Sequence, residues 1–299
     1  MPGKAYIHVD VFSPHPYSGN SLAVFLDAAG LDGEQMDAIT KELRHFESIF
    51  LEPSEEPRTY SARVFDLNEE LAFAGHPLIG AACALHDSQP TPDRVRWTLR
   101  LKARTVTVET ERRSARRYFA VLDQGPAEFF GEPEPSRFAE IAAWFSLGAD
   151  DLDRDLPPEI VSTGLRYLVL SVRGDALARA RIAIGDLEQK LGAMGAQFAY
   201  LLHAEHLEAR HWTNDGAIED VATGSGAGCA AAYLRSHDRI GDGESVVLKQ
   251  GRFTGRSSEI VMRAHGEDRR VRSVEIGGEV SIVGEGRLHE LPELRAQAR

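Results

Sequence analysis

The sequence is poor in cysteine and has no long apolar run. Its two cysteines, Cys83 and Cys229, are too few for a disulfide framework, which favours a cytoplasmic location. They also lack the histidine spacing of a zinc site. No stretch offers the ~18 consecutive apolar residues that a membrane-spanning helix needs. The N-terminus enters an alternating strand directly, without the apolar core of a signal peptide. We therefore expect a cytoplasmic protein with no membrane span and no metal.

Positive charge is also scarce. Lys and Arg number 34 against 46 Asp and Glu, which gives a formal net charge of −12 at pH 7. A nucleic-acid-binding surface needs a concentrated basic face, so this class of function is not expected. The two local arginine clusters, at residues 112–117 and 269–272, are interpreted as solvated surface near strand ends.

Alternation of apolar and polar residues dominates the chain and predicts strands. The alternating segments cover residues 6–11, 95–101, 106–108, 118–122, 167–172 and 271–283. One amphipathic helix is expected between Asp32 and Leu43, because Asp32 can cap it and Gln35 follows three residues later. The chain is thus predicted to be strand-rich, with few helices.

Two segments predict helices without a polar face, which belong inside a core. HPLIGAACAL and SGAGCAAAYL each follow a glycine, and the preceding residues Ala74 and Thr223 lie 149 positions apart, almost half the chain. This spacing predicts a duplication: two lobes, each a curled sheet around one buried helix. We expect an N-terminal lobe of residues 1–126, completed by about 282–299, and a C-terminal lobe of residues 127–281. The chain is expected to cross near residues 125–135.

Such a duplication has a consequence for binding. If the lobes face each other across a cleft, both buried helices can aim their N-termini into it. Helix N-termini carry unpaired N–H groups and a positive dipole potential, so they form an anion clamp. A small substrate with a carboxylate fits this expectation.

The glycine-rich stretch EDVATGSGAG, residues 219–228, allows two interpretations. It lacks the Lys-Ser/Thr ending of a phosphate-binding loop, and it does not match the dinucleotide pattern GxGxxG. No parallel αβ alternation surrounds it either. Its glycines therefore serve either the close approach of a small ligand or tight helix packing, and the stretch alone does not decide between them.

Three polar residues are the candidates for chemistry. In strand alternation Glu47 shares a face with Ile49 and Leu51, and a carboxyl group buried among apolar side chains has a raised pKa that suits proton transfer. The alternative is a surface strand whose face is assigned wrongly. His76 lies at the start of the first buried helix, although a lone histidine is more often structural. Asp220 precedes the second helix and can pair with a histidine or hold a substrate amine.

Other constellations are weaker. His203, His206 and His211 with Glu205 and Glu208 resemble a ligand cluster, but their spacing fits neither helical H-x3-H nor a structural zinc pattern. No G-x-S-x-G elbow occurs, and Ser225 has no adjacent base in the sequence, which disfavours acyl transfer.

Six blocks in order resemble the PhzF family of phenazine-biosynthesis isomerases, which have the diaminopimelate-epimerase-like fold. The blocks are HVDVFSPHPYSGNSLAVFLD, FESIFL, ELAFAGHPLIGAA, STGLRYLVL, EDVATGSGAGCAAAYL and KQGRFTGR. Each short motif is weak, but the ordered set is specific and spreads from residue 8 to about residue 256. The resemblance therefore covers nearly the whole chain.

The resemblance implies an α+β fold of two pseudo-symmetric lobes, each a barrel-like, mostly antiparallel sheet around a central helix, in a homodimer. It implies a site between the lobes that uses neither cofactor nor metal and acts on a small carboxylate or amino acid. Family members of the phenazine pathway isomerise trans-2,3-dihydro-3-hydroxyanthranilate by moving a proton between ring carbons. Glu47 is then the general acid/base, with His76 and Asp220 as its polar partners. The residues implied in substrate binding are Asn20, Gly75, Gly164, Gly224, Ser225 and Gly226.

Departures from the family pattern leave the substrate open. Arg44-His45-Phe46 stands where Asn-Leu-Ser is common, Asp66-Leu67 replaces Thr-Pro, and Val221 replaces a proline. Racemases of this fold have a cysteine just before each helix glycine, where this chain has Ala74 and Thr223, so two-thiol racemisation is not expected. The alternatives are an epimerase that uses carboxylates and a non-catalytic module that binds a small ligand.

Overall fold

The computed structural model describes residues 3–293, which fold into two compact units of mixed strands and helices. The N-terminal unit comprises Met1–Leu122 and Gly277–Arg299, and the C-terminal unit comprises Asp123–Ile276. Residues 1–2 and 294–299 of the predicted N-terminal lobe lie outside the described residues. Two strands, β8 (Arg117–Gly125) and β16 (Arg270–Arg287), contribute residues to both units.

The sheet of the N-terminal unit closes on itself. Its other strands are β1 (Ala5–Val11), β2 (Asn20–Phe25), β3 (Glu47–Pro53), β4 (Thr59–Asp66), β5 (Glu70–Leu71), β6 (Arg94–Arg100) and β7 (Thr105–Ser114). Their order is β1-β2-β3-β4-β6-β7-β8-β16, β5 pairs with β4, and β16 pairs back to β1. Strand pairs β2–β3 and β4–β6 are parallel, whereas β1–β2, β1–β16, β3–β4, β4–β5, β6–β7 and β7–β8 are antiparallel. The predicted strands at residues 6–11, 95–101, 106–108 and 118–122 are confirmed.

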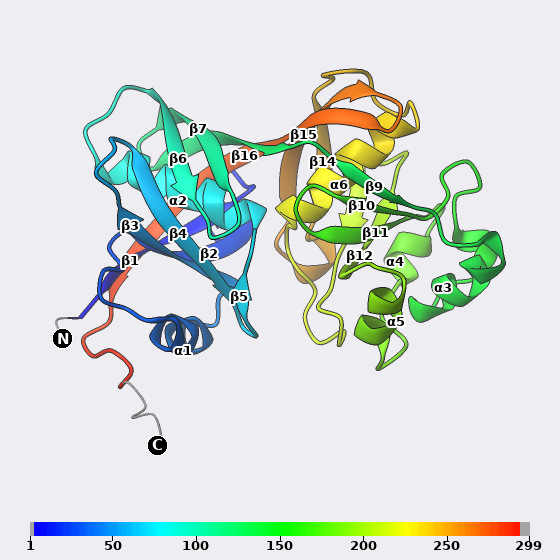
Figure 1. The fold of residues 1–299 in the computed structure, drawn as a ribbon, viewed down its shortest axis with the longest axis horizontal. Helices are drawn as coiled ribbons and strands as arrows, with labels where there is room; N and C mark the ends of the chain where they lie inside the picture. Colours follow the sequence, from blue (N-terminus) through cyan, green and yellow to red (C-terminus); the bar gives the residue numbers. More distant parts are fainter. Residues whose placement is uncertain (1–2, 294–299) are drawn as a thin grey trace. The chain divides into compact units, whose positions relative to one another are not determined.

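Helix α2 (Gly75–Ser88) is the core of this unit, enclosed by its strands (Figure 1). Every residue from Gly75 to His86 is buried, because the helix has no polar face to present to water. Gly80 lets the helix approach the sheet: a Cβ at this position would lie 2.7 Å from Leu22 and 2.9 Å from Val9. The prediction of a buried first helix is confirmed.

Helix α1 (Gly33–Leu43) covers the outer face of the same sheet (Figure 1). It begins with the predicted capping box, in which the Asp32 carboxylate accepts from the Gln35 amide at 2.8 Å and the Gln35 side chain accepts from the Asp32 amide. Met36 and Ile39 pack into an outer apolar cluster whose other buried members are Ala23, Phe25, Ala28, Leu31, Phe50 and Phe65. The strands therefore bury both of their faces near α1.

The C-terminal unit repeats the plan with an additional outer layer. Its own strands are β9 (Glu128–Gly131), β10 (Glu159–Ser162), β11 (Arg166–Ser171), β12 (Phe198–His203), β13 (Glu208–Arg210), β14 (Val246–Gln250) and β15 (Ser258–Glu267). They follow the order β16-β15-β14-β13-β12-β11-β10-β9. Pairs β11–β12 and β13–β14 are parallel, and β14–β15, β12–β13, β10–β11 and β9–β10 are antiparallel. The strands predicted at 167–172 and 271–283 are confirmed.

Helix α6 (Gly224–Ser236) is the buried helix of this unit, and it packs against β10, β11, β12 and β15. All residues from Gly224 to Leu234 are buried, as the absence of a polar face predicts. The smaller helices are η1 (Pro135–Arg137), α3 (Phe138–Trp144), η2 (Ala149–Asp151), α4 (Ala176–Arg179), α5 (Leu187–Ala193) and η3 (Arg252–Thr254).

Helices α3, α4 and α5 form a second apolar core in the C-terminal unit (Figure 1). Trp144, Leu177 and Leu187 pack there with Leu168 and Leu170 of β11. Neither of the two buried helices is amphipathic, whereas these outer helices and α1 have one apolar side. The mixed α+β class expected from the sequence is confirmed, and within residues 3–293 no helix is long and apolar enough to span a bilayer.

Candidate active site

Strand β3 places the carboxyl group of Glu47 inside the N-terminal unit. Phe50 belongs to the outer cluster beneath α1, so alternation turns Glu47, Ile49 and Leu51 to the opposite face, where α2 lies. Only 7% of Glu47 is exposed. The parallel register with β2 pairs Glu47 with Leu22. The predicted sharing of a face with Ile49 and Leu51 therefore agrees with this geometry, and the alternative of a surface strand does not.

His76, in the first turn of α2, contacts this carboxylate. Its Nδ1 lies 3.3 Å from Glu47 Oε2 and 3.4 Å from the side-chain amide of Asn20, at the start of β2. All three side chains are buried. A protonated Nδ1 donates to the carboxylate, and an unprotonated Nδ1 accepts from the amide, so the group retains a partner in both protonation states. We refer to Glu47, His76 and Asn20 as the acid–imidazole group.

The backbone amides in the first turn of α2 donate no hydrogen bond to a capping side chain. Its N-cap residue is Ala74, whose methyl group cannot accept a hydrogen bond from the amides of the first turn. Gly75 and His76 follow directly. The amides that a polar N-cap would otherwise satisfy are therefore suited to an anionic group.

In the C-terminal unit Asp220 belongs to a buried polar network at the start of α6. Its Oδ2 accepts from the Thr223 hydroxyl at 2.6 Å, and its backbone carbonyl accepts from the Gln250 amide at 3.0 Å. Gln250 also donates to Thr223 Oγ1 and accepts from the Thr223 amide, at 2.9 and 3.1 Å. Thr223 is the N-cap residue, yet its hydroxyl goes to Asp220 and does not cap the helix. The amides in the first turn of α6, like those of α2, therefore donate no hydrogen bond to a capping side chain.

Ser225 and Gly224 are fixed from neighbouring strands. The Ser225 hydroxyl lies 2.8 Å from the Tyr167 hydroxyl of β11. Gln124 of β8 donates to the Gly224 carbonyl at 3.0 Å and accepts from Thr163 at 2.7 Å. The predicted site residues Asp220, Gly224 and Ser225 are thus each held by hydrogen bonds at the start of α6.

Two glycines of α6 also allow neighbouring side chains to pack closely against the helix. A Cβ on Gly226 would lie 2.6 Å from the Tyr200 ring, and one on Gly228 would overlap the side chain of Gln124. Tight packing therefore explains Gly226 and Gly228, while Gly224 begins the helix. Gly164 has a φ of 146°, a conformation that favours glycine, and its amide donates to the Ser162 hydroxyl at 3.0 Å.

Of the three histidines in the weaker ligand pattern, two lie together and the third has other neighbours. The rings of His203 and His206 stack at 4.3 Å, and His211 Nδ1 bonds the Ala199 carbonyl at 2.9 Å. Glu208 forms a two-fold ion pair with Arg252. Among residues 3–293 no group of three His, Cys, Asp or Glu side chains is arranged to hold a metal ion.

Both cysteines are buried free thiols within α2 and α6. Burial raises the pKa of Cys229 to about 12 and the pKa of Cys83 well above its ordinary value. A thiol acts as a base or nucleophile only as the thiolate, so these two side chains are unsuited to either role near neutral pH.

Four contributing residues did not stand out in the sequence: Gln124, Thr163, Tyr167 and Gln250. Three of them lie in two of the blocks that resemble the PhzF family, since STGLRYLVL holds Thr163 and Tyr167, and KQGRFTGR holds Gln250. A polar side chain within a strand gives no sign of its hydrogen-bond partner, which depends on how distant strands pair.

The departures Arg44-His45-Phe46 have local structural roles. Arg44 is the left-handed C-cap of α1, with a φ of 56°, and its amide donates to the Thr40 carbonyl. His45 Nδ1 lies 3.1 Å from the Ser21 hydroxyl, next to Asn20. This bond ties the residues before β3 to the start of β2, the two strands that carry Glu47 and Asn20.

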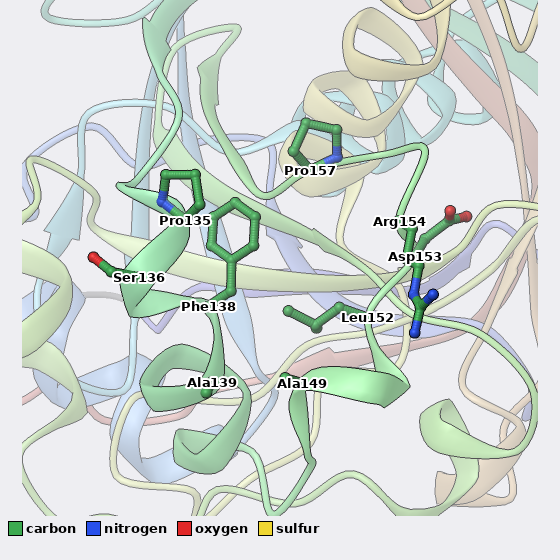
Figure 2. Close-up of a pocket in the computed structure, with 9 residues that line it drawn as sticks. All are labelled: Pro135, Ser136, Phe138, Ala139, Ala149, Leu152, Asp153, Arg154 and Pro157. Carbon is green, nitrogen blue, oxygen red and sulfur yellow. The ribbon is translucent and has the colours of Figure 1, made fainter.

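One surface pocket lies elsewhere in the C-terminal unit (Figure 2). It has a volume of about 370 Å³ and is lined by Phe138, Leu152 and Arg154 among others. Figure 2 shows the Phe138 ring between Pro135 and Leu152. None of the predicted site residues lines this pocket, and its only charged lining residues are Asp153 and Arg154.

Comparison with known proteins gives one consistent result. The profile of a family described as phenazine biosynthesis-like proteins matches residues 9–286. A trans-2,3-dihydro-3-hydroxyanthranilate isomerase from Pseudomonas aeruginosa is 30% identical over 292 residues, covering 95% of this chain and 99% of the relative. A solved structure described as a predicted epimerase, also from Pseudomonas aeruginosa, is 45% identical with a TM-score of 0.91, covering 96% and 99% of the two chains. A PhzF-family structure from Bacillus anthracis has a TM-score of 0.82 at 22% identity, with the same coverage.

Proposed function

The chain belongs to the PhzF family of phenazine biosynthesis-like proteins, whose relatives include named isomerases, and we propose that it isomerises a small unsaturated or cyclic amino acid by moving a proton between carbons. Trans-2,3-dihydro-3-hydroxyanthranilate, or a related intermediate of secondary metabolism, is the first substrate to test. The observation that carries the proposal is the buried contact between Glu47 Oε2 and His76 Nδ1 at 3.3 Å.

The proposed reaction has two proton transfers. The Glu47 carboxylate first removes a proton from a carbon of the substrate, and the electron pair of the broken C–H bond shifts the double bond. The resulting Glu47 carboxylic acid then returns a proton to a different carbon of the same system. His76 Nδ1 faces the Glu47 carboxyl group throughout, and the side-chain amide of Asn20 holds the His76 ring at the same nitrogen. Atoms balance over the cycle without a cofactor or metal.

The charged groups of the substrate are assigned to the starts of the two buried helices and to Asp220. Amides at the starts of α2 and α6, including those of Gly75, Gly224 and Ser225, take the substrate carboxylate. Asp220, a buried carboxyl group whose Oδ2 accepts from Thr223, takes the substrate amino group. In this proposal Gly164 and Gly226 shape the region around the substrate. We further propose a cytoplasmic location, as expected from the low cysteine content, and a homodimer, as implied by the resemblance to the family.

A second candidate is epimerisation at a carbon that bears an amino or carboxyl group. It is favoured by the 45% identical neighbour, which is described as a predicted epimerase. In this chain it would use carboxylates, since Ala74 and Thr223 occupy the positions before the helix glycines and both thiols are buried.

Turnover in D2O, followed by NMR, distinguishes the candidates. Isomerisation incorporates deuterium at the carbon that receives the proton and shifts the double bond, whereas epimerisation exchanges the α-carbon proton and loses optical purity. For Glu47→Gln we expect a fall in kcat of about 10²- to 10⁴-fold, because the amide cannot accept the proton. Glu52→Gln, on the exposed end of the same strand, is the matched control and should keep wild-type activity.

Full activity of Glu47→Gln on a verified substrate would show that another group moves the proton. Tight binding of the substrate by both wild type and Glu47→Gln, without turnover by either, would instead support a binding module.

A further inference from the structure

A hairpin places His211 directly opposite Asp220. Trp212 and Glu219 form an antiparallel bridge, and the Asp220 amide donates to the His211 carbonyl at 2.9 Å. Residues directly opposite in an antiparallel pair project to the same side, with Cβ atoms about 5 Å apart. Glu219 binds Arg210, and Arg210 stacks on Trp212, so these three occupy the other side. His211 and Asp220 therefore share the opposite side of the hairpin, and both are buried.

The proton position on the His211 ring is determined by its partner. His211 Nδ1 lies 2.9 Å from the Ala199 carbonyl, which accepts only, so Nδ1 carries a hydrogen. In the neutral ring Nε2 is then the unprotonated nitrogen. Any proton that the ring gains binds at Nε2 and produces an imidazolium.

Aromatic side chains surround this ring. Tyr167 of β11 and Phe198 and Tyr200 of β12 have ring centroids 5.6, 5.7 and 6.4 Å from that of His211. The titratable side chains around His211 include Asp220 on its own hairpin, and Tyr167 and Tyr200, whose rings contact the imidazole and whose hydroxyls bond Ser225 and Gln250. Burial lowers the pKa of His211, and the negative charge of Asp220 opposes part of that effect.

We propose that His211 is a positioning residue that determines, by gaining or losing a proton, whether the carboxylate of Asp220 is available to a cationic amino group of the substrate. Neutral His211 makes no ion pair with Asp220. Protonated His211 forms an ion pair with Asp220, which competes with the substrate amine. The inference rests on the proposed role of Asp220 and assigns the substrate class as an amino acid whose amine is positively charged.

The coupling is tested first without turnover. Ring nitrogens of His211 are followed by NMR as the pH changes in wild type and in Asp220→Asn, with His211→Asn used to assign the signals. We expect the Nδ1–H tautomer at pH 7.5 and an apparent pKa below the ordinary value of about 6.5. In Asp220→Asn the pKa should fall further, because a negative charge that favours the imidazolium has been removed. The same pKa in both proteins, or an Nε2–H tautomer, would overturn the proposal.

The effect on the reaction is then read from KM against pH. His211→Asn keeps an N–H near the Ala199 carbonyl but cannot take up a proton, and His211→Gln serves if it fails to fold. In wild type we expect KM to rise as the pH falls through the pKa of His211, while kcat changes by less than about threefold. This rise should vanish in His211→Asn and persist in the exposed control His206→Asn. A rise that persists in His211→Asn would overturn the proposal. Absence of turnover with an intact NMR coupling would contradict the proposed function instead.

Discussion

Helices α2 and α6 are alike in position and different in chemistry. Each is buried, begins at a glycine, and has an N-cap that leaves the first amides uncapped. Beside the start of α2 lies a carboxylate in contact with an imidazole, at Glu47 and His76. Beside the start of α6 lies a network of hydroxyls and amides around Asp220. The same architecture thus places a carboxylate–imidazole contact in one unit and a network of hydroxyls and amides in the other.

The sheets around the two helices also differ. In the N-terminal unit β16 pairs with β1 and the sheet closes, whereas in the C-terminal unit the strand order ends at β9. The glycines of the two helices also have different neighbours. Gly80 of α2 meets the methyl groups of Leu22 and valines, and Gly228 of α6 meets Gln124. Apolar packing alone therefore explains Gly80. At Gly228 the neighbour is Gln124, a side chain that also forms a hydrogen bond to the Gly224 carbonyl.

The largest effect is expected from breaking the acid–imidazole group in the N-terminal unit. His76→Asn removes the ring beside Glu47 and should lower kcat/KM for the isomerisation by about 10²-fold or more. Steady-state kinetics on folded protein, with folding checked by circular dichroism, measure this. Activity within tenfold of wild type would show that His76 is only a packing residue.

His86 is the matched control at the other end of α2. Its Nδ1 and Nε2 bond Thr110 and the Pro92 carbonyl, far along the helix from Glu47, so His86→Asn should keep its activity per folded molecule.

Burial lowers the pKa of His86 below its ordinary value of 6.5. Its contribution to the free energy of unfolding is therefore full above pH 6.5 and falls as the pH drops through the folded-state pKa. Thermal melts should show a smaller loss on acidification in His86→Asn than in wild type.

A smaller effect is expected in the C-terminal unit. Asp220→Asn keeps an acceptor for Thr223 but loses the negative charge, so we expect KM to rise by about 10- to 100-fold, with a smaller change in kcat. Asp215→Asn, at the exposed tip of the same hairpin, should behave as wild type. A fall in kcat with KM unchanged would assign Asp220 to proton transfer and remove the contrast between the units.

The two helix glycines give a further comparison. Gly80→Ala and Gly228→Ala should each lower the free energy of unfolding by about 1–3 kcal/mol through overpacking. Only Gly228→Ala should also raise KM, because it displaces Gln124 from the Gly224 carbonyl. Denaturant melts and kinetics measure both. Gly192→Ala, where a Cβ meets nothing within 4 Å, is the control and should not be destabilised. Equal KM values for Gly80→Ala and Gly228→Ala would contradict the assigned role of Gln124.

The smallest effect is expected from the cysteines. Cys83→Ala and Cys229→Ala should keep kcat within about threefold of wild type, since both thiols are buried and held protonated. A variant lacking both side chains should still exchange deuterium into the substrate. Loss of activity with the fold retained would show that a thiol takes part in the reaction.

Periodicity predicted most of the fold, because burial and alternation are local properties of the sequence. The strands at 6–11 and 95–101, helix α1 with its capping box, and the two buried helices all follow from spacing and composition. The glycine stretch 219–228 could not be interpreted in this way. Whether Gly226 and Gly228 serve a ligand or packing depends on Tyr200 and Gln124, which lie on other strands.

From the sequence alone come the two buried helices, the shared pattern before each of them, and an acid on a strand whose face the pattern leaves open between apolar and exposed. These features follow from side-chain chemistry at short spacing. Only the tertiary structure decided which polar groups meet: Glu47 with His76, Gln250 with Asp220 and Thr223, and His211 opposite Asp220. The physical reason is that hydrogen bonds require contact within about 3 Å, and strand pairing across long stretches of chain creates that contact.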